Sequence, residues 1–262
     1  MFQQKRLVLT AILFVAAASQ LAAQSQSTSF RVDTDVYDAE KKEPVKQTLT
    51  LFDQGVYYDF AIDNSQDVTI VDPRHGKIVL LSPKRGVKTL FPTDELLAYV
   101  SEARQKITNS DLTKVIAHEN QVVFDAADSK LRVGDSTLMY EATMQPPKDA
   151  SIAAQYRDFA DWSARLNAVL PPRYPPFLRL ELNKQIAERI MLPSRIDRVS
   201  KHNNHTLAYR SQLIVNGRLS TEDQQKIVSV GQLLQSCKEV TQTEFLGDHP
   251  ALISKTRSVS SR

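Results

Sequence analysis

The sequence predicts an α+β fold, in which a curved antiparallel β-sheet, incomplete and barrel-like, has three to four helices packed against it. Six short β-rich runs follow one another in the first half of the chain, with turn sequences between them. Amphipathic helical segments then separate the later groups of strands. The composition agrees, because a chain of 262 residues that is 42% hydrophobic and 24% charged can build a globular core.

The N-terminus has the layout of a secretory signal peptide. Lys5 and Arg6 precede an uncharged, mostly apolar run over 7–18, and small residues follow it. This run is shorter than the roughly 20 residues that a transmembrane helix needs. We therefore predict cleavage after Ala23 and export to the periplasm or the extracellular space, the alternative being an uncleaved N-terminal anchor. No later stretch approaches a membrane span, so we expect no integral span after cleavage.

The apparent basicity of the chain is largely targeting charge. Removal of residues 1–23 takes away Lys5 and Arg6 and no acid, so the formal net charge falls from +3 to +1. A charge near zero gives no electrostatic reason to expect nucleic acid as a partner. We expect one α+β domain over 24–248, with an alternative boundary near 145–150, and a flexible tail over 249–262.

Turn chemistry divides the first half into strands. Alternation of apolar and polar residues over 30–37 predicts a strand with one buried face. The segment 46–66 holds two β-rich runs on either side of Asp53-Gln54-Gly55, which is a hairpin signal. Three further runs, divided by Pro-to-Gly turns, complete a meander. These runs are 67–72, 77–82 and 86–91, and the turns are 73–76 and 83–86.

Four helices are predicted from apolar stripes at helical spacing. Thr93 and Ser220 supply the N-cap side chains of the first and the last helix. The segment 178–191 fits both a helix and a strand, and its helix propensity favours the helix. The predicted helices cover 94–107, 149–169, 178–191 and 221–237.

The second half also contains strands and a proline-rich segment. Four prolines in 171–177 predict either an ordered connector whose aromatic side chains pack on the fold, or a plain polyproline spacer. Asn203-Asn204 marks the turn of a hairpin. The predicted strands are 120–127, 130–134, 136–143, 194–201, 205–215 and 239–245.

The sequence lacks the motifs of several common chemistries. No two of its seven glycines are closer than ten residues, which excludes the glycine-rich phosphate loops and the hydrolase elbow. His118-Glu119 is not followed by the second histidine of a zinc-protease helix. The one cysteine, Cys237, lies on an apolar helix stripe and is expected to be a small buried hydrophobe. We predict no cofactor, no metal ligands and no catalytic residues.

Two polar pairs are weak site candidates. Asp33 and Asp35 point the same way on the first strand and could hold a cation, but a solvated strand face explains them as well. His202 and His205 flank a turn, where a solvated polar loop is the expected role.

Some strands are apolar on both of their faces, among them Val56-Tyr57-Tyr58 and Ile78 to Leu81. Either one face packs on helices while the other lines a cavity, or both faces are covered. On the first alternative we predict a ligand-binding set. Its members are Val56, Tyr58, Phe60, Ile70, Leu80 and Phe91. Tyr156, Phe159 and Trp162 could also wall a pocket, although core packing is the more common role of aromatic side chains at helical spacing.

The strand pattern resembles the LolA/LolB superfamily of envelope lipoprotein carriers. The resemblance is carried by the signal peptide and by the runs FRVDTDVY (30–37), TLTLFDQGVYYDFAI (48–62), DVTIVD (67–72), GKIVLL (76–81) and VKTLF (87–91). It covers roughly residues 28–145 and is one of pattern rather than of a diagnostic motif, and the helix-rich stretch 149–192 departs from it. It implies a curved, incomplete barrel closed over by helices, with a concave apolar face that binds acyl chains.

These observations favour a non-catalytic binding protein of the cell envelope. Its expected ligand is a lipid, an acyl chain or a lipoprotein, held in an apolar cleft between the sheet and the helices. The alternative is an envelope structural or interaction protein without a ligand cavity, which would dock another envelope protein through a strand edge or the 171–177 segment. A hydrolase with an unrecognised site is a third interpretation, and it would need a histidine beside two acids.

Overall fold

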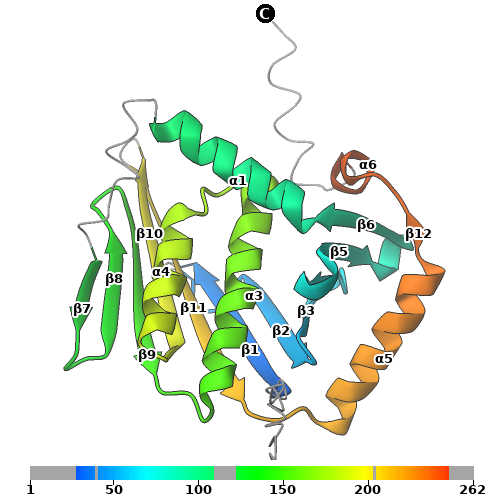
Figure 1. The fold of residues 1–262 in the computed structure, drawn as a ribbon, viewed down its shortest axis with the longest axis horizontal. Coiled ribbons are helices and arrows are strands. Elements are labelled where there is room, and N and C mark those ends of the chain that lie inside the picture. The colour runs from blue at the N-terminus through cyan, green and yellow to red at the C-terminus, as the bar shows by residue number, and fades with distance from the viewer. Residues whose placement is uncertain (1–27, 39–40, 109–121, 203–204, 248–262) are drawn as a thin grey trace, which may run out of the picture.

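The computed structural model describes residues 28–38, 41–108, 122–202 and 205–247 (Figure 1). Within them the chain is α+β, as the sequence predicts. The strands are β1 (Phe30–Asp38), β2 (Lys46–Asp53), β3 (Val56–Ala61), β4 (Val68–Asp72), β5 (Lys77–Ser82), β6 (Val87–Pro92), β7 (Val122–Asp125), β8 (Lys130–Gly134), β9 (Leu138–Gln145), β10 (Leu192–His202), β11 (His205–Asn216) and β12 (Lys238–Glu239). The helices are α1 (Thr93–Thr108), α3 (Ala150–Val169), α4 (Phe177–Glu188), α5 (Thr221–Ser236) and α6 (Gln242–Gly247). The predicted signal peptide, the C-terminal tail and His118 lie outside the described residues.

The strands form one twelve-stranded sheet that does not close into a barrel. Its order is β12-β6-β5-β4-β3-β2-β1-β11-β10-β9-β8-β7. All neighbours are antiparallel except β12, which pairs parallel with β6. The pairing of β1 with β11 joins the N-terminal meander to the C-terminal strands, so segments from both ends of the chain meet in the middle of the sheet.

The two Pro-to-Gly turns fold as single 3₁₀ turns between β4, β5 and β6. Each begins at a proline, whose fixed φ suits the first turn position. Each ends at a glycine, Gly76 or Gly86, with φ near +64° (63° and 65°), a conformation that costs other residues energy. These turns keep the meander antiparallel, as the sequence predicts.

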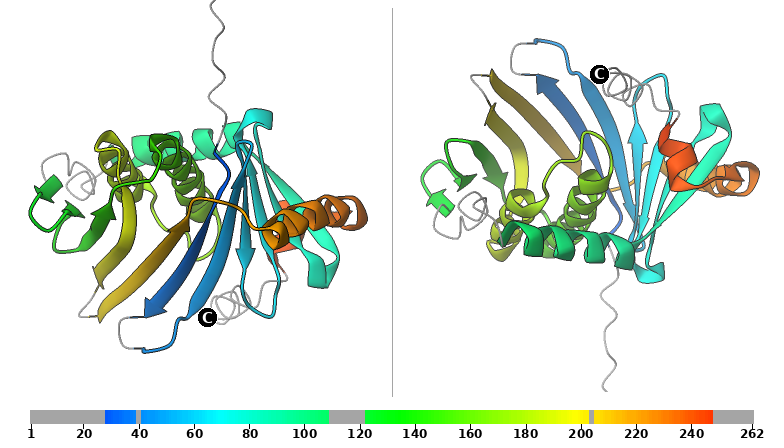
Figure 2. Two further views of the ribbon diagram at one scale, coloured as in Figure 1. Left: turned by 90° about the horizontal axis from the view of Figure 1, so that it is seen from below. Right: turned by 90° about the horizontal axis from the view of Figure 1, so that it is seen from above.

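The helices cover the sheet unevenly (Figure 2). The sheet curves into a trough, with α1, α3 and α4 against its concave side. The main core lies there and includes Phe30, Phe52, Ile78, Leu131 and Leu182. On the opposite side, α5 covers β3, β4 and β5 through a second apolar cluster. The buried members of this α5 cluster are Val68, Ile70, Val79, Leu81, Val230 and Cys237.

Two of the sequence predictions need correction. The segment 239–245 is not a strand, because only Lys238–Glu239 pairs with β6 before helix α6 begins. The hydroxyl of Thr241 accepts the backbone N–H of Glu244 and so caps this helix, which buries Phe245. Because of α6, the described residues contain five helices rather than three to four.

The ambiguous segment 178–191 is a helix, as predicted, since α4 spans Phe177–Glu188.

No helix in the described part of the chain is both long enough and apolar enough to cross a membrane.

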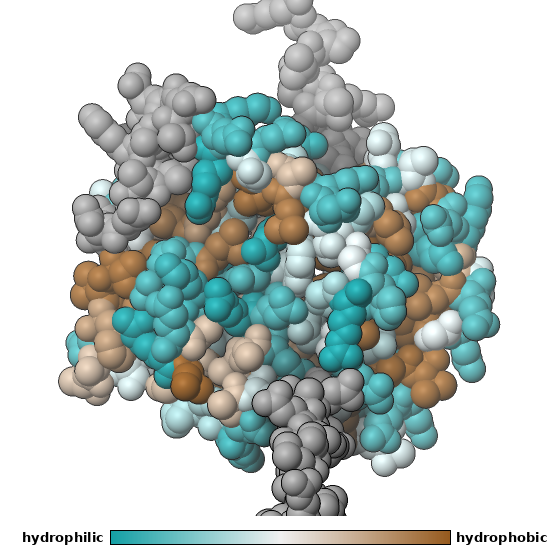
Figure 3. Space-filling model, viewed as in Figure 1, coloured by the Kyte–Doolittle hydropathy of each residue, from teal (hydrophilic) through white to brown (hydrophobic). Residues whose placement is uncertain are grey.

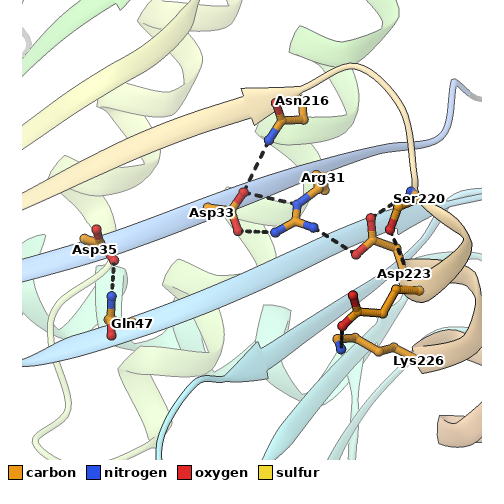
Figure 4. A network of polar contacts seen from close by, with 9 residues as sticks. Arg31, Asp33, Asp35, Gln47, Asn216, Ser220, Asp223 and Lys226 are labelled. Atoms are coloured by element: carbon orange, nitrogen blue, oxygen red, sulfur yellow. Dashed lines mark hydrogen bonds and ion pairs between the residues drawn. The ribbon is translucent and has the colours of Figure 1, made fainter.

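A buried carboxylate fixes the start of α5 to the sheet (Figure 4). Asp223 is 1% exposed and shares a capping box with Ser220, in which each side chain bonds the other residue's backbone N–H. The Arg31 guanidinium on β1 donates to Asp223 Oδ1 at 3.0 Å and also pairs with Asp33. The network thus ties the helix N-terminus to the centre of the sheet.

We predict that Asp223→Ala lowers the free energy of unfolding by about 2–4 kcal/mol, because it removes an N-cap interaction and a charged hydrogen bond together. The matched control is Glu222→Ala, since Glu222 is the exposed neighbour that pairs with Lys226 one turn later. It should cost about 0.5 kcal/mol or less. Chemical denaturation followed by circular dichroism measures both variants. Equal unfolding midpoints for the two would contradict the anchoring role of Asp223.

Candidate ligand-binding cavity

A cavity of about 580 Å³ lies between the concave face of the sheet and α3. Its floor comes mainly from β1, β2, β10 and β11, with one residue each from β3 and β9. Its roof comes from α3, the connector between α3 and α4, and Arg179 of α4. The volume is within the range of about 300–1,000 Å³ that is typical of small-molecule sites. The apolar and aromatic lining residues are Val32, Val36, Val45, Tyr140, Tyr156, Phe159, Ala160, Ala164, Leu170, Pro171, Pro172, Tyr174, Pro175, Pro176, Ile196, Tyr209 and Leu213. The polar lining residues are Thr34, Lys46, Thr48, Thr50, Asp59, Ser163, Asn167, Arg179, Arg198 and Ser211.

The cavity exists because α3 stands away from the strands beneath it. α4 lies close against β8, β9 and β10, whereas the close neighbours of α3 are the helices α1 and α4. Aromatic rings fill the space under one part of α3. Phe52 stacks on Phe30 at 4.0 Å between ring centroids, and Phe159 meets Phe52 edge-on at 5.5 Å and Tyr57 at 6.0 Å. These edge-on contacts are a preferred packing geometry of aromatic rings, and they occupy the space between this part of α3 and the strands.

The register of the strands shows which way the cavity runs. Phe30 and Val32 lie at the aromatic end of β1, and Thr34 and Val36 follow on the same face. At the far end of this row, Val45 is 46% exposed. One end of the cavity is therefore closed by aromatic rings, while the other meets solvent.

A carboxylic acid lies in the cavity wall. The Thr50 hydroxyl on β2 donates to Asp59 Oδ1 on β3 at 2.7 Å. Burial raises the pKa of Asp59, while the hydrogen bond from Thr50 and the nearby charge of Lys46 act against that shift. On the opposite wall, burial raises the pKa of Tyr156, which hydrogen-bonds with Arg179 of α4.

Arg198 of β10 enters the cavity near its solvent end. Its guanidinium lies over the ring of Tyr174 in the connector, with 3.9 Å from Cζ to the ring centroid. Phe177 at the start of α4 is covered by Arg104 in the same way, at 5.4 Å. The aromatic residues of the 171–177 segment thus pack on the fold, which confirms the first of the two sequence interpretations of that segment.

The structure does not bring the six predicted ligand-binding residues together. Four of them, Val56, Tyr58, Phe60 and Ile70, belong to the α5 cluster on the far side of the sheet. Leu80 and Phe91 lie on the concave side but inside the main core. None of the six lines the cavity. At the two doubly apolar runs, Val56 to Tyr58 and Ile78 to Leu81, both faces are packed, which is the second of the two alternatives for these strands.

The other candidates have separate locations. Tyr156 and Phe159 line the cavity, whereas Trp162 packs against the Arg165 guanidinium at 4.9 Å. Asp33 and Asp35 share the outer face of β1, where they bond Arg31 and Gln47 in a polar network (Figure 4). This is the solvated strand face that the sequence favours. In the described ranges, no group of three or more His, Cys, Asp or Glu side chains could hold a metal ion.

Apart from Tyr156 and Phe159, sequence reasoning missed the residues that line the cavity, although two signals pointed to some of them. Val32 and Val36 belong to the alternating run of the first strand, and Tyr174 belongs to the proline-rich segment. Neither signal distinguishes a cavity wall from ordinary core. Apolar residues are also visible outside, beside α5 and near the β7–β8 end, whereas the surface over α3 and α4 is mostly hydrophilic (Figure 3).

A scan against models of known protein families finds no match to this sequence, and a search of curated proteins finds no relative.

The raised pKa of Asp59 predicts a distinctive pH dependence. The folded state keeps the Asp59 proton to higher pH than the unfolded chain, in which this aspartate titrates near 3.8. The contribution of Asp59 to stability is therefore present at low pH and is lost as the pH rises through the folded-state pKa. Asp59→Asn accepts the same hydrogen bond without titrating, so its stability relative to wild type should grow with pH.

Asp63→Asn is the control of opposite sign. Hydrogen bonds from Ser65 lower the pKa of Asp63, so wild type should gain stability over this variant as the pH rises. Guanidinium unfolding at a series of pH values measures both differences. A stability difference between wild type and Asp59→Asn that is constant with pH, or that changes in the other direction, would show that Asp59 is not destabilised by burial.

Proposed function

We propose that this protein binds an elongated lipid or acyl chain in the cavity under α3 and catalyses no reaction on it. The observation that carries the proposal is the cavity itself, which is closed by aromatic rings at one end, open to solvent at the other and lined mainly by apolar side chains. An acyl chain lying along Val32 and Val36 would remove apolar surface from water on both partners. Such burial contributes roughly 25 cal/mol per Å².

The resemblance of the strand pattern to the LolA/LolB superfamily supports the same proposal. In that superfamily a curved, incomplete sheet closed by helices holds acyl chains on its concave face. The open twelve-stranded sheet, with helices on its concave side, is an architecture of this kind. The acyl chain of a lipoprotein is therefore one form that the ligand would take, and the signal peptide predicted from the sequence agrees with action in the periplasm or outside the cell.

The cavity also bears on the two alternative functions, an envelope interaction protein and a hydrolase. The alternative, an envelope interaction protein, is expected to have a closed core without a cavity and to dock a partner through a strand edge or the 171–177 segment. Tyr174, Pro175 and Pro176 instead face the cavity and form part of its wall. Among the described lining residues the acid is Asp59, so the histidine beside two acids that a hydrolase would need is not assembled there.

We predict that the protein carries a lipid when it is purified without detergent. The full chain would be exported to a bacterial periplasm, and its organic extract compared by mass spectrometry with that of an unrelated exported protein. A ligand near one per protein is expected. Ser163→Phe places a ring in the cavity and should reduce the ligand to the level of the unrelated protein.

Ala154→Phe is the matched control, because Ala154 is exposed on the same helix and does not line this cavity. It should retain the ligand. Extracts of wild type that match those of the unrelated protein would contradict lipid binding and would favour the interaction protein. Equal ligand in both variants would place the binding site elsewhere.

A further inference from the structure

The cavity is lined mainly by apolar side chains but has an excess of positive charge. Three of its described lining residues are basic, Lys46, Arg179 and Arg198, and one is acidic, Asp59. Low-dielectric walls make the electrostatic interactions of such charges stronger than they would be in water.

Two acids that lie near these cations in the fold, Asp59 and Asp38, have interactions of their own. Burial raises the pKa of Asp59, which favours its neutral form, and Lys46 lies near it. Asp38 ends β1 opposite Tyr209, the residue that lies opposite Arg198, and it pairs with Lys41 at 3.9 Å. Among the described residues no carboxylate forms an ion pair with Arg179 or Arg198. The positive charge at this end of the cavity is thus left for another partner.

Arg198 has a donor that nothing in the described structure uses. Its Nε is buried and has no hydrogen-bond partner among the described residues. A buried N–H without an acceptor is costly, and a guanidinium N–H is a strong donor to carboxylate or phosphate oxygens. Arg198 lines the cavity, and the stack on Tyr174 holds its guanidinium in the wall, so the orientation of this cation is set before a ligand arrives.

The start of α4 adds to the same field. Pro175 and Pro176 line the cavity directly before this twelve-residue helix, and no side chain caps its N-terminus. The first turn contains no acid and includes Arg179. A helix N-terminus carries partial positive charge, so a cation there is unfavourable unless an anion lies nearby.

We propose that the ligand is a single-chain amphiphile with an anionic head, a carboxylate or a phosphate, whose head binds Arg198 while the chain extends toward Phe159. This inference rests on the proposed function, because it assigns the chemistry of the ligand in the same cavity. Its position follows from the register, which places Arg198 at the Asp38 end of β1 and Val32 toward the aromatic rings.

The test compares three probes that share one alkyl chain, namely decanoate, decyl phosphate and the neutral decanol. Calorimetric titration of the full chain is carried out at neutral pH, where a carboxylic acid with a pKa of about 4–5 is ionised. We expect wild type to bind at least one of the anionic probes about tenfold or more tightly than decanol, as a charged hydrogen bond predicts. The stronger of the two anionic probes identifies the head as carboxylate or phosphate.

Variants on the two faces of β10 locate the effect. Arg198→Gln should lower the affinity for the preferred anionic probe about tenfold and leave the affinity for decanol within about twofold of wild type. Arg198→Lys should restore part of the lost affinity. Lys201→Gln removes one positive charge from the opposite face of the same strand and should leave the affinity for both probes unchanged. Circular dichroism establishes that each variant is folded.

The outcomes separate this inference from the proposed function. If wild type binds decanol as tightly as the anionic probes, the cavity holds alkyl chains but the inference of an anionic head group is wrong. Equal weakening of all probes in Arg198→Gln would also overturn it, since Arg198 would then act only on the shape of the cavity. If wild type binds none of the three, the proposed function fails together with it.

Discussion

The structure depends on a sheet that stays open and must therefore have its concave face covered by helices. A closed barrel would fill its interior with its own side chains, but this trough needs α1, α3 and α4 to remove its apolar face from water. The cover is uneven because the rings of Phe52, Tyr57 and Phe159 hold α3 away from the strands. The cavity is the space that remains beyond those rings, and the proline-rich connector closes part of it.

The opposite face of the sheet divides into two regions with different chemistry. Over β3, β4 and β5 the face is apolar, and α5 covers it, fixed by the bonds of Asp223 to Ser220 and Arg31. Over β1, β11 and β10 the face carries ion pairs, such as those that Asp197 forms with Arg195 and Arg210. Charged pairs that are partly exposed add little stability, but they keep this face solvated. In this protein, apolar side chains on both faces of a strand therefore indicate that both faces are packed. The cavity instead lies beside strands in which apolar and polar residues alternate.

Much of the fold could be predicted from local sequence, and the cavity could not. Proline, glycine and aspartate at the turns predicted the meander, and Thr93 and Ser220 marked the starts of α1 and α5. The strand predicted over 239–245 was wrong, because the alternation of residue types there was given more weight than the helix-capping signal of Thr241. The six residues of the predicted ligand set lie in two separate clusters for a reason of parity. Val56 and Leu80 are both apolar strand residues, but they point to opposite faces of the sheet. Which face a helix covers, and how closely, depends on contacts distant in sequence.

Methyl NMR would test the central claim that an alkyl chain enters the cavity under α3 rather than the apolar layer under α5. The full chain, labelled at Val, Leu and Ile methyl groups, would be titrated with decanol, which has no charged head. The account predicts shifts at Val32, Val36 and Leu213, with the methyl groups of Val68, Val79 and Leu81 unchanged. Shifts confined to the methyl groups under α5, or no shifts at all, would contradict it.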